Sequence, residues 1–167
     1  MNNQAFIDGQ NLYLGTSKCD EPWTLDLKRF RKHLEQKYGV KEAYYFFGAY
    51  DSEQQDLYDF IQRCGYILRF REHIPQMTGH KKGNVDTDIV FLIMYKLYMK
   101  EDFDKVVLVS GDGDYKRLVS FLIRENRFAK LIAPDRKRLS SLYRKIDSCL
   151  IDVLGSSDKR KLLEYKK

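Results

Sequence analysis

The chain has 167 residues, of which 43% are hydrophobic and 32% are charged, and its formal net charge is +6 at pH 7. This length suits one domain with a sizeable core, because a chain of this size removes about two-thirds of its unfolded surface from water. No apolar stretch reaches the roughly 18 residues that a bilayer span needs, and nothing resembles a signal peptide. We therefore expect a cytoplasmic protein with no membrane partner. The positive charge favours polyanions as partners.

The cysteines exclude two further classes of protein. The three cysteines are odd in number and show no Cys-x-x-Cys spacing. This pattern argues against a disulfide framework and against a zinc site. We interpret them as reduced cysteines of the core.

In chain order, strand and helix signals alternate, which is the pattern of an α/β fold. Strands are expected at 4–8, 40–50, 66–70, 105–110 and 128–133, with a last apolar segment at 150–153. Helices are expected at 25–38, 52–64, from 86 to about 97, beyond 114, and briefly from 140. The turn formers of residues 9–22 predict a loop, and residues 71–85 predict a long basic one.

Three local signals support these helix boundaries. Gly39 stands where a glycine can end the helix over 25–38. Ser52 and Gln55 form a capping-box pattern, and Asp86 is expected to cap the helix that follows it. We assign residues 1–154 to one domain, and residues 155–167 to a basic polar tail that is a frayed helix or disordered.

Acidic residues occur where apolar strand-like runs end or helices begin. Asp8 ends the first strand, Asp86 precedes a helix, and Asp112 and Asp114 follow the strand over 105–110. Because the carboxyl ends of strands in an α/β sheet converge on one crevice, these side chains can meet. Clustered carboxylates repel one another unless a divalent cation neutralises them, and oxygen ligands suit Mg²⁺ or Mn²⁺. Such an ion can activate water against a phosphodiester. Taken singly, each acid also fits a turn or a cap.

Three segments, in this order, resemble the signatures of NYN domains: FIDGQNL at 6–12, KGNVD at 82–86 and SGDGDY at 110–115. These domains belong to the PIN-like nuclease superfamily, and the bacterial branch related to LabA is the most similar in appearance. The likeness covers roughly residues 4–153. It implies a three-layer α/β/α sandwich with a central, mainly parallel sheet.

The same resemblance implies a metal-dependent ribonuclease centre, an endonuclease with RNA as its partner. Its metal ligands and catalytic residues would be Asp8, Asp86, Asp112 and Asp114, with Mg²⁺ or Mn²⁺ as the cofactor. Asn11 and Ser110 would orient the metal ligands or a phosphate oxygen. Lys82, beside the acids, would hold the scissile phosphate by its charge. RNA would enter along the basic loop that carries Arg71 and Lys81.

One feature departs from the family pattern. Similar sequences often carry another acid one or two turns into the helix that starts at Asp86, where residues 91–93 are apolar here. Asp88 points about 200° away from Asp86, because a helix turns by about 100° per residue. The number of bound metals and the retention of catalysis therefore stay open.

Two alternative functions follow. The first is a catalytically silent RNA-binding or regulatory module of the same fold. The second is a phosphatase of the haloacid dehalogenase type, which the segment 110–114 suggests. That class needs Asp-x-Asp after the first strand, whereas Gln10 stands two residues after Asp8. A homodimer, with Leu57 and Tyr58 as candidate contacts, is also open.

Overall fold

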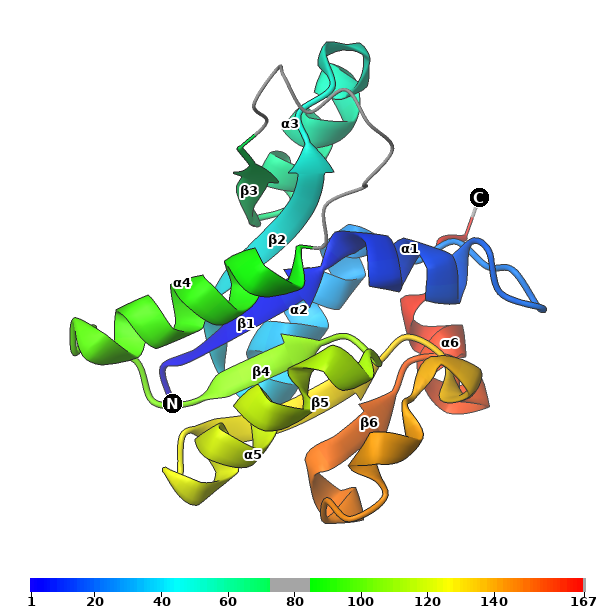
Figure 1. Ribbon diagram of the computed structural model, residues 1–167. Helices are drawn as coiled ribbons and strands as arrows, with labels where there is room; N and C mark the ends of the chain where they lie inside the picture. The colour runs from blue at the N-terminus through cyan, green and yellow to red at the C-terminus, as the bar shows by residue number, and fades with distance from the viewer. Residues whose placement is uncertain (73–84, 167) are drawn as a thin grey trace, which may run out of the picture.

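A computed structural model describes residues 1–72 and 85–166, and its centre is a six-stranded parallel sheet (Figure 1). The strands are β1 (Asn3–Asp8), β2 (Val40–Ala49), β3 (Ile67–Arg71), β4 (Val106–Val109), β5 (Phe128–Ala133) and β6 (Ile151–Val153). Their order across the sheet is β3-β2-β1-β4-β5-β6. The chain therefore winds outward in both directions from the β1–β4 pair, so the strand order reverses there.

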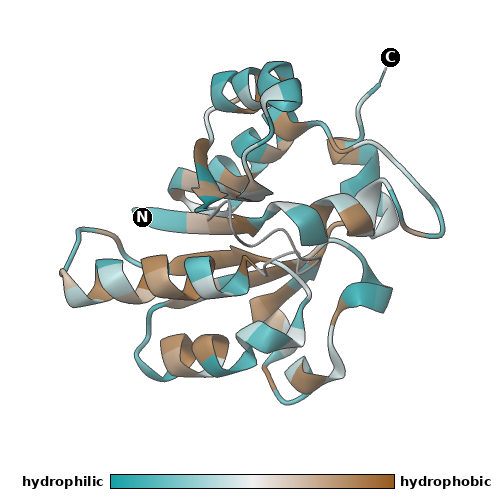
Figure 2. Cartoon of the chain, turned by 45° about the horizontal axis from the view of Figure 1, so that its top comes forward, coloured by the Kyte–Doolittle hydropathy of each residue, from teal (hydrophilic) through white to brown (hydrophobic). Residues whose placement is uncertain are grey.

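Helices cover both faces of this sheet. They are α1 (Gly9–Thr16), α2 (Leu27–Tyr38), α3 (Gln55–Arg63), α4 (Asp86–Tyr98), α5 (Lys116–Arg124) and α6 (Ser157–Leu163). One core lies between the sheet and α4 with α5, and the other lies between the sheet and α2, α3 and α6. The central strands are the most hydrophobic part of the fold (Figure 2). This is the expected α/β/α sandwich, and none of the helices in its described part is long and apolar enough for a bilayer.

The helix expected at 25–38 shows how its sequence fixes its ends. The Asp26 carboxylate accepts a hydrogen bond from the Arg29 backbone N–H at 3.0 Å and caps the helix. Phe30 and Leu34, one turn apart, are fully buried against the sheet. Gly39 ends the helix with a φ of 64°, a conformation that glycine adopts without strain.

The loop expected at residues 9–22 is partly wrong, because α1 begins directly after β1. The Asp8 carboxylate accepts a hydrogen bond from the Asn11 N–H at 3.0 Å and so starts a helix among residues that favour turns. Leu12 and Thr16, one turn apart, are buried. A single cap and a buried face therefore outweigh the local turn preference.

Two expected helix caps are also wrong. Asp51, not Ser52, accepts the hydrogen bond from the Glu53 N–H at 3.0 Å that opens the turn before α3. The residue before the first turn of α4 is Val85, and Asp86 is already inside the helix without capping it. The Asp86 carboxylate instead lies near other acids.

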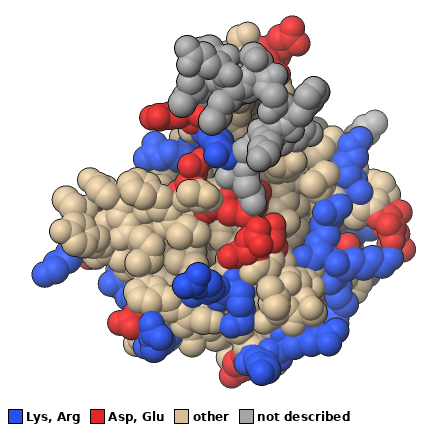
Figure 3. Space-filling view, in the orientation of Figure 1, with Lys and Arg blue, Asp and Glu red and all other residues tan. Residues whose placement is uncertain are grey.

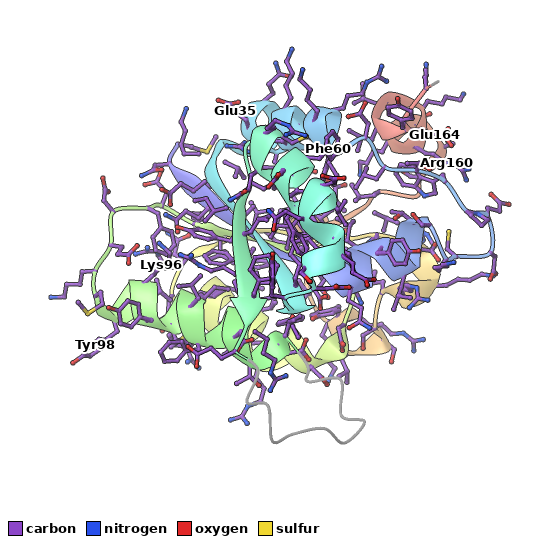
Figure 4. The ribbon with its side chains drawn as sticks, turned by 90° about the horizontal axis from the view of Figure 1, so that it is seen from above. Glu35, Phe60, Lys96, Tyr98, Arg160 and Glu164 are labelled. Carbon is purple, nitrogen blue, oxygen red and sulfur yellow. The ribbon has the colours of Figure 1, made fainter. Side chains whose placement is uncertain are left out.

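The expected tail contains a docked helix. Leu163 of α6 is buried against the core around α2, and Glu164 forms an isolated bridge with Leu25. Figure 4 shows Arg160 of α6 beside Glu164, the residue after this helix, and their side chains approach to 3.5 Å. A buried leucine and a backbone bridge thus attach this basic segment to the fold.

Other side chains differ from expectation in their exposure. The cysteines are free, but Cys149 is exposed and the other two are half-buried rather than central to the core. Tyr58, a candidate dimer contact, is buried against Phe47 and Phe70, whereas Leu57 is exposed. The described surface therefore leaves only Leu57 of that pair available to a partner.

Gly111, just after β4, allows two loops at the carboxyl edge of the sheet to touch. A Cβ at this position would overlap the backbone carbonyl of Arg138. The Ser140 N–H also donates a hydrogen bond to the Gly111 carbonyl at 2.9 Å. The segment after β5 is thereby fixed against the loop that carries Asp112.

Gly111→Ala should lower the free energy of unfolding by about 1–3 kcal/mol, because the new methyl group would force backbone apart. Chemical denaturation measures this change. Gly48→Ala is the matched control, since nothing lies within 4 Å of a Cβ there. It should leave stability unchanged or raise it by less than about 1 kcal/mol. Equal stability of the two variants would contradict the close approach.

Candidate functional site

The acidic residues lie at the carboxyl edge of the sheet, where the strand order reverses. In the β1–β4 pair Ile7 is opposite Val109, so Asp8 and Ser110 leave the two strands side by side. Asp112 follows two residues later, and α4 begins at Asp86 beside them. Ligand sites of open α/β sheets form at this place, outside the strand ends at the reversal.

Three carboxylates form a compact group. One oxygen each from Asp86, Asp112 and Asp114 lies within 4.8 Å of the other two. Asp86 is buried, Asp112 is half-buried and Asp114 is exposed, so the group runs from the interior to the surface. Figure 3 shows acidic side chains gathered in the middle of this face, beside the end of β4. The oxygen donors and their spacing suit a hard divalent cation.

Asp8 lies next to this group but does not belong to it, among the residues that the structure describes. It is only 4% exposed, and both of its carboxylate oxygens accept hydrogen bonds. Oδ1 accepts from the Asn11 N–H at 3.0 Å, and Oδ2 accepts from the Tyr115 hydroxyl at 3.2 Å. Asp8 therefore supports the group from its buried side.

Hydrogen bonds fix the loop after β4, which carries two of the acids, and join it to α1. The Gly111 N–H donates to Oδ1 of Asn11 at 3.0 Å and ties the start of α1 to the loop after β4. The Asp112 N–H donates to the Ser110 hydroxyl oxygen at 3.1 Å, and the Asp114 N–H donates to Oδ1 of Asp112 at 3.0 Å. Asn11 and Ser110 thus brace the carboxylates in this structure.

The acids shift one another's ionisation. Burial raises the pKa of Asp8, hydrogen bonds from Asn11 and Tyr115 counteract part of this rise, and the charge of Asp112 adds to it. Burial also raises the pKa of Asp86 to about 6, with further increases from the charges of Asp112 and Asp8. Both shifts show that negative charge is unfavourable here without a compensating cation.

Two buried tyrosines at the site were missed by sequence reasoning. Tyr115 is fully buried, and burial together with the charges of Asp8 and Asp86 raises the pKa of its hydroxyl. Tyr143, which is 1% exposed, donates a hydrogen bond to the backbone carbonyl of Asp112. An aromatic residue directly after Asp114 was the available signal for Tyr115, although core packing explains such a residue equally well.

Basic residues flank the acids on the described surface. Arg71 ends β3 and is half-buried, whereas Lys81 and Lys82 lie outside the described residues. The turn Arg136–Arg138 adjoins the loop after β4 through the contact with Gly111. Figure 3 shows a band of basic side chains over this side of the molecule, from α6 to the segment after β5.

The sequence model of the NYN domain matches residues 4–153, which is most of the chain. The chain belongs to the NYN domain family. This confirms the resemblance seen in the three acidic signatures and agrees with the observed parallel sheet. The phosphatase alternative has no support in this match.

Two further proteins are similar to this NYN domain. "Low amplitude and bright protein LabA" from Synechococcus elongatus is 26% identical over 139 residues, which cover 78% of this chain and 72% of that protein. A crystal structure of a protein of unknown function from Vibrio parahaemolyticus has a TM-score of 0.74 and 22% identity, with 98% of this chain and 96% of that chain covered. At this identity the second likeness shows the fold alone.

The pKa of Asp86 gives a prediction for the NYN domain kept metal-free with chelator. The pKa is about 6 in the fold against an ordinary value of 3.8, so at intermediate pH the folded protein holds a proton that the unfolded chain has released. Stability therefore falls as the pH rises through this window. Asp86→Asn should raise the free energy of unfolding at neutral pH by about 1–2 kcal/mol, allowing for screening, and should have no such effect below about pH 4.

Denaturant unfolding at the two pH values measures this effect. Asp88→Asn, on the same helix but outside the carboxylate group, is the control and should not stabilise the protein at neutral pH. If Asp86→Asn were equally inert, the ionised Asp86 would not be an unfavourable group in the fold.

Proposed function

We propose that this NYN domain is a metal-dependent ribonuclease that cleaves RNA phosphodiester bonds within the strand. The observation that carries the proposal is the convergence of Asp86, Asp112 and Asp114 at the strand-order reversal. The assignment to the NYN family supports the same chemistry. Asp8 braces the group from below and is the fourth acid of the proposed centre.

Asp86, Asp112 and Asp114 would hold a Mg²⁺ or Mn²⁺ ion through carboxylate oxygens, with Asp8 completing the charge of the set. An ion of this kind supplies a water of lowered pKa and stabilises charge on the departing oxygen. The graded exposure of the three acids supports this assignment, because the exposed Asp114 leaves one side of the group open to a substrate.

The remaining roles concern orientation and charge. Asn11 and Ser110 would fix the ligands, since they brace the loop of Asp112 by hydrogen bonds. Arg71, Lys81 and Lys82 would neutralise phosphates of the entering strand.

RNA is the partner that the charge distribution supports. The chain carries a net charge of +6 in spite of its acidic centre. The turn Arg136–Arg138 lies against the loop after β4, so backbone phosphates on either side of a bond at the acids would meet basic side chains. Within the described residues, Lys137 of this turn already pairs with Asp20, which leaves the two arginines as the stronger candidates.

Asp112→Asn should reduce the rate of RNA cleavage by more than about 100-fold. Residues that only support a metal ligand contribute up to about 100-fold, and a ligand itself should contribute more. The assay incubates purified protein with a mixed RNA pool and Mn²⁺, Mg²⁺ or chelator, and follows product on gels. Chelator should stop cleavage by the unaltered protein. Asp158→Asn, an exposed acid on α6, is the control and should cleave normally.

The same variants separate an enzyme from the silent RNA-binding alternative. A ribonuclease loses turnover in Asp112→Asn while its RNA affinity persists. A binding module has no turnover to lose, so binding without any metal-dependent cleavage by the unaltered protein would favour that alternative. Cleavage that ignores both the chelator and the substitution would indicate a contaminating nuclease.

Charge reversal in the turn Arg136–Arg138 should weaken RNA binding. We expect Arg136→Glu with Arg138→Glu, in the Asp112→Asn background, to reduce the slope of log K against log salt by about 1 for each phosphate that the protein no longer neutralises. Fluorescence anisotropy over a salt series measures it. Arg124→Glu, at the far end of α5, is the control. An equal reduction in that variant would show that net charge alone governs binding.

A further inference from the structure

We infer that the hydroxyl group of Tyr115 positions the carboxylates of Asp8 and Asp86 for metal binding, and that its removal weakens the metal site. This inference rests on the metal site of the proposed function. Tyr115 is a positioning residue, because it acts through the two acids and is not itself a proposed ligand.

The first support is the direct contact. Tyr115 donates its hydroxyl hydrogen to Oδ2 of Asp8 at 3.2 Å, between groups that are both buried. The same hydroxyl also interacts with the carboxylate of Asp86. One hydroxyl therefore lies between the fully enclosed acid at the end of β1 and the buried acid at the start of α4.

The second support is the place of Tyr115 in the chain. It follows Asp114 directly and closes the 3-10 turn Gly113–Tyr115, while its ring packs in the core formed with α4 and α5. The backbone that carries Asp112 and Asp114 thus also carries the hydroxyl that reaches Asp8 and Asp86. All four acids are linked through this one turn.

The third support is the cost of an oxygen in this position. A buried hydroxyl is unfavourable unless it is hydrogen-bonded, and a phenylalanine would fill the same core space without that cost. Asp8 and Asp86 are both buried, so their carboxylates have little access to water and need hydrogen-bond donors from the protein. The hydroxyl holds the two acids at a fixed separation while they repel each other, which preorganises them for a cation.

Tyr115→Phe tests the inference, because it removes one oxygen and keeps the ring. Its matched control is Tyr66→Phe. Tyr66 is also buried and donates its hydroxyl hydrogen to the Leu27 carbonyl at 2.8 Å, but it packs in the other core, which Tyr115 does not enter. Circular dichroism and thermal unfolding without metal verify that both variants fold. Each variant gives up a buried hydrogen bond and with it some stability, so stability is not the deciding readout.

The deciding readout is the Kd for Mn²⁺ alone, measured by isothermal titration calorimetry without RNA. A pH of about 8, well above the value of about 6 for Asp86, keeps protonation of that acid out of the comparison. Tyr115→Phe should bind Mn²⁺ about 10–100-fold more weakly than the unaltered protein, the usual effect of removing an outer-shell partner. Tyr66→Phe should bind as the unaltered protein does.

The outcomes separate this inference from the proposed function. Equal Mn²⁺ affinity of Tyr115→Phe and the unaltered protein, or an equal weakening in Tyr66→Phe, would overturn the inference alone. Mn²⁺ binding that weakens as expected in Tyr115→Phe, but without RNA cleavage by the unaltered protein, would support the inference and reject the ribonuclease. An unaltered protein that binds no Mn²⁺ would reject both.

Discussion

The parallel pairing of β1 with β4 determines where Asp8 and the loop that carries Asp112 and Asp114 lie. Because Ile7 is opposite Val109, both strands end at the same level, and the next residues, Asp8 and Ser110, lie side by side. The strand order reverses at this pair, so the connections leave on opposite sides and the space above the strand ends stays open. A shift of this register by one residue would turn one of the two acidic loops away from the other.

The site concentrates negative charge that the protein alone only partly offsets. Asp8 gains a backbone donor from Asn11 and a hydroxyl donor from Tyr115, and Asp112 gains the N–H of Asp114. The pKa values of the two buried acids, Asp8 and Asp86, nevertheless stay raised. The remaining repulsion between these carboxylates disfavours the metal-free state. A divalent cation would relieve it, because one ion carries two positive charges.

The alternation of strand and helix signals predicted the α/β sheet, and the resemblance to NYN domains implied its layers. Of the four acids predicted to meet, Asp86, Asp112 and Asp114 form one group and Asp8 lies beside it. The helix α1 was missed because its start depends on one cap from Asp8 and on burial of Leu12, and turn-forming residues around it point the other way. Burial of Leu12 in the core thus outweighed the local preference of these residues for a turn.

The supporting side chains were harder to predict, because their roles depend on long-range contacts. Tyr115 reaches an acid 107 positions away, and nothing in its neighbourhood distinguishes it from a core aromatic. The packing of Arg138 on Gly111 likewise joins two loops whose proximity only the sheet order determines. Patterns show which residues are acidic at strand ends, whereas packing decides which neutral residues hold them.

The exposure of the acids increases from Asp8 and Asp86 to Asp114, and this determines from which side a substrate can approach them. Asp8 and Asp86 are buried, Asp112 is half-buried and Asp114 is exposed, so solvent reaches the group from the side of Asp114. A polyanion repelled by these carboxylates must approach from that side, where a bound cation would screen them and basic side chains stand nearby. Backbone contacts with Gly111 hold the turn Arg136–Arg138 against the loop that carries Asp112 and Asp114, and Lys137 of this turn also pairs with Asp20. Under the proposed function, the arginines of this turn would meet phosphates at a position that is fixed relative to the acids.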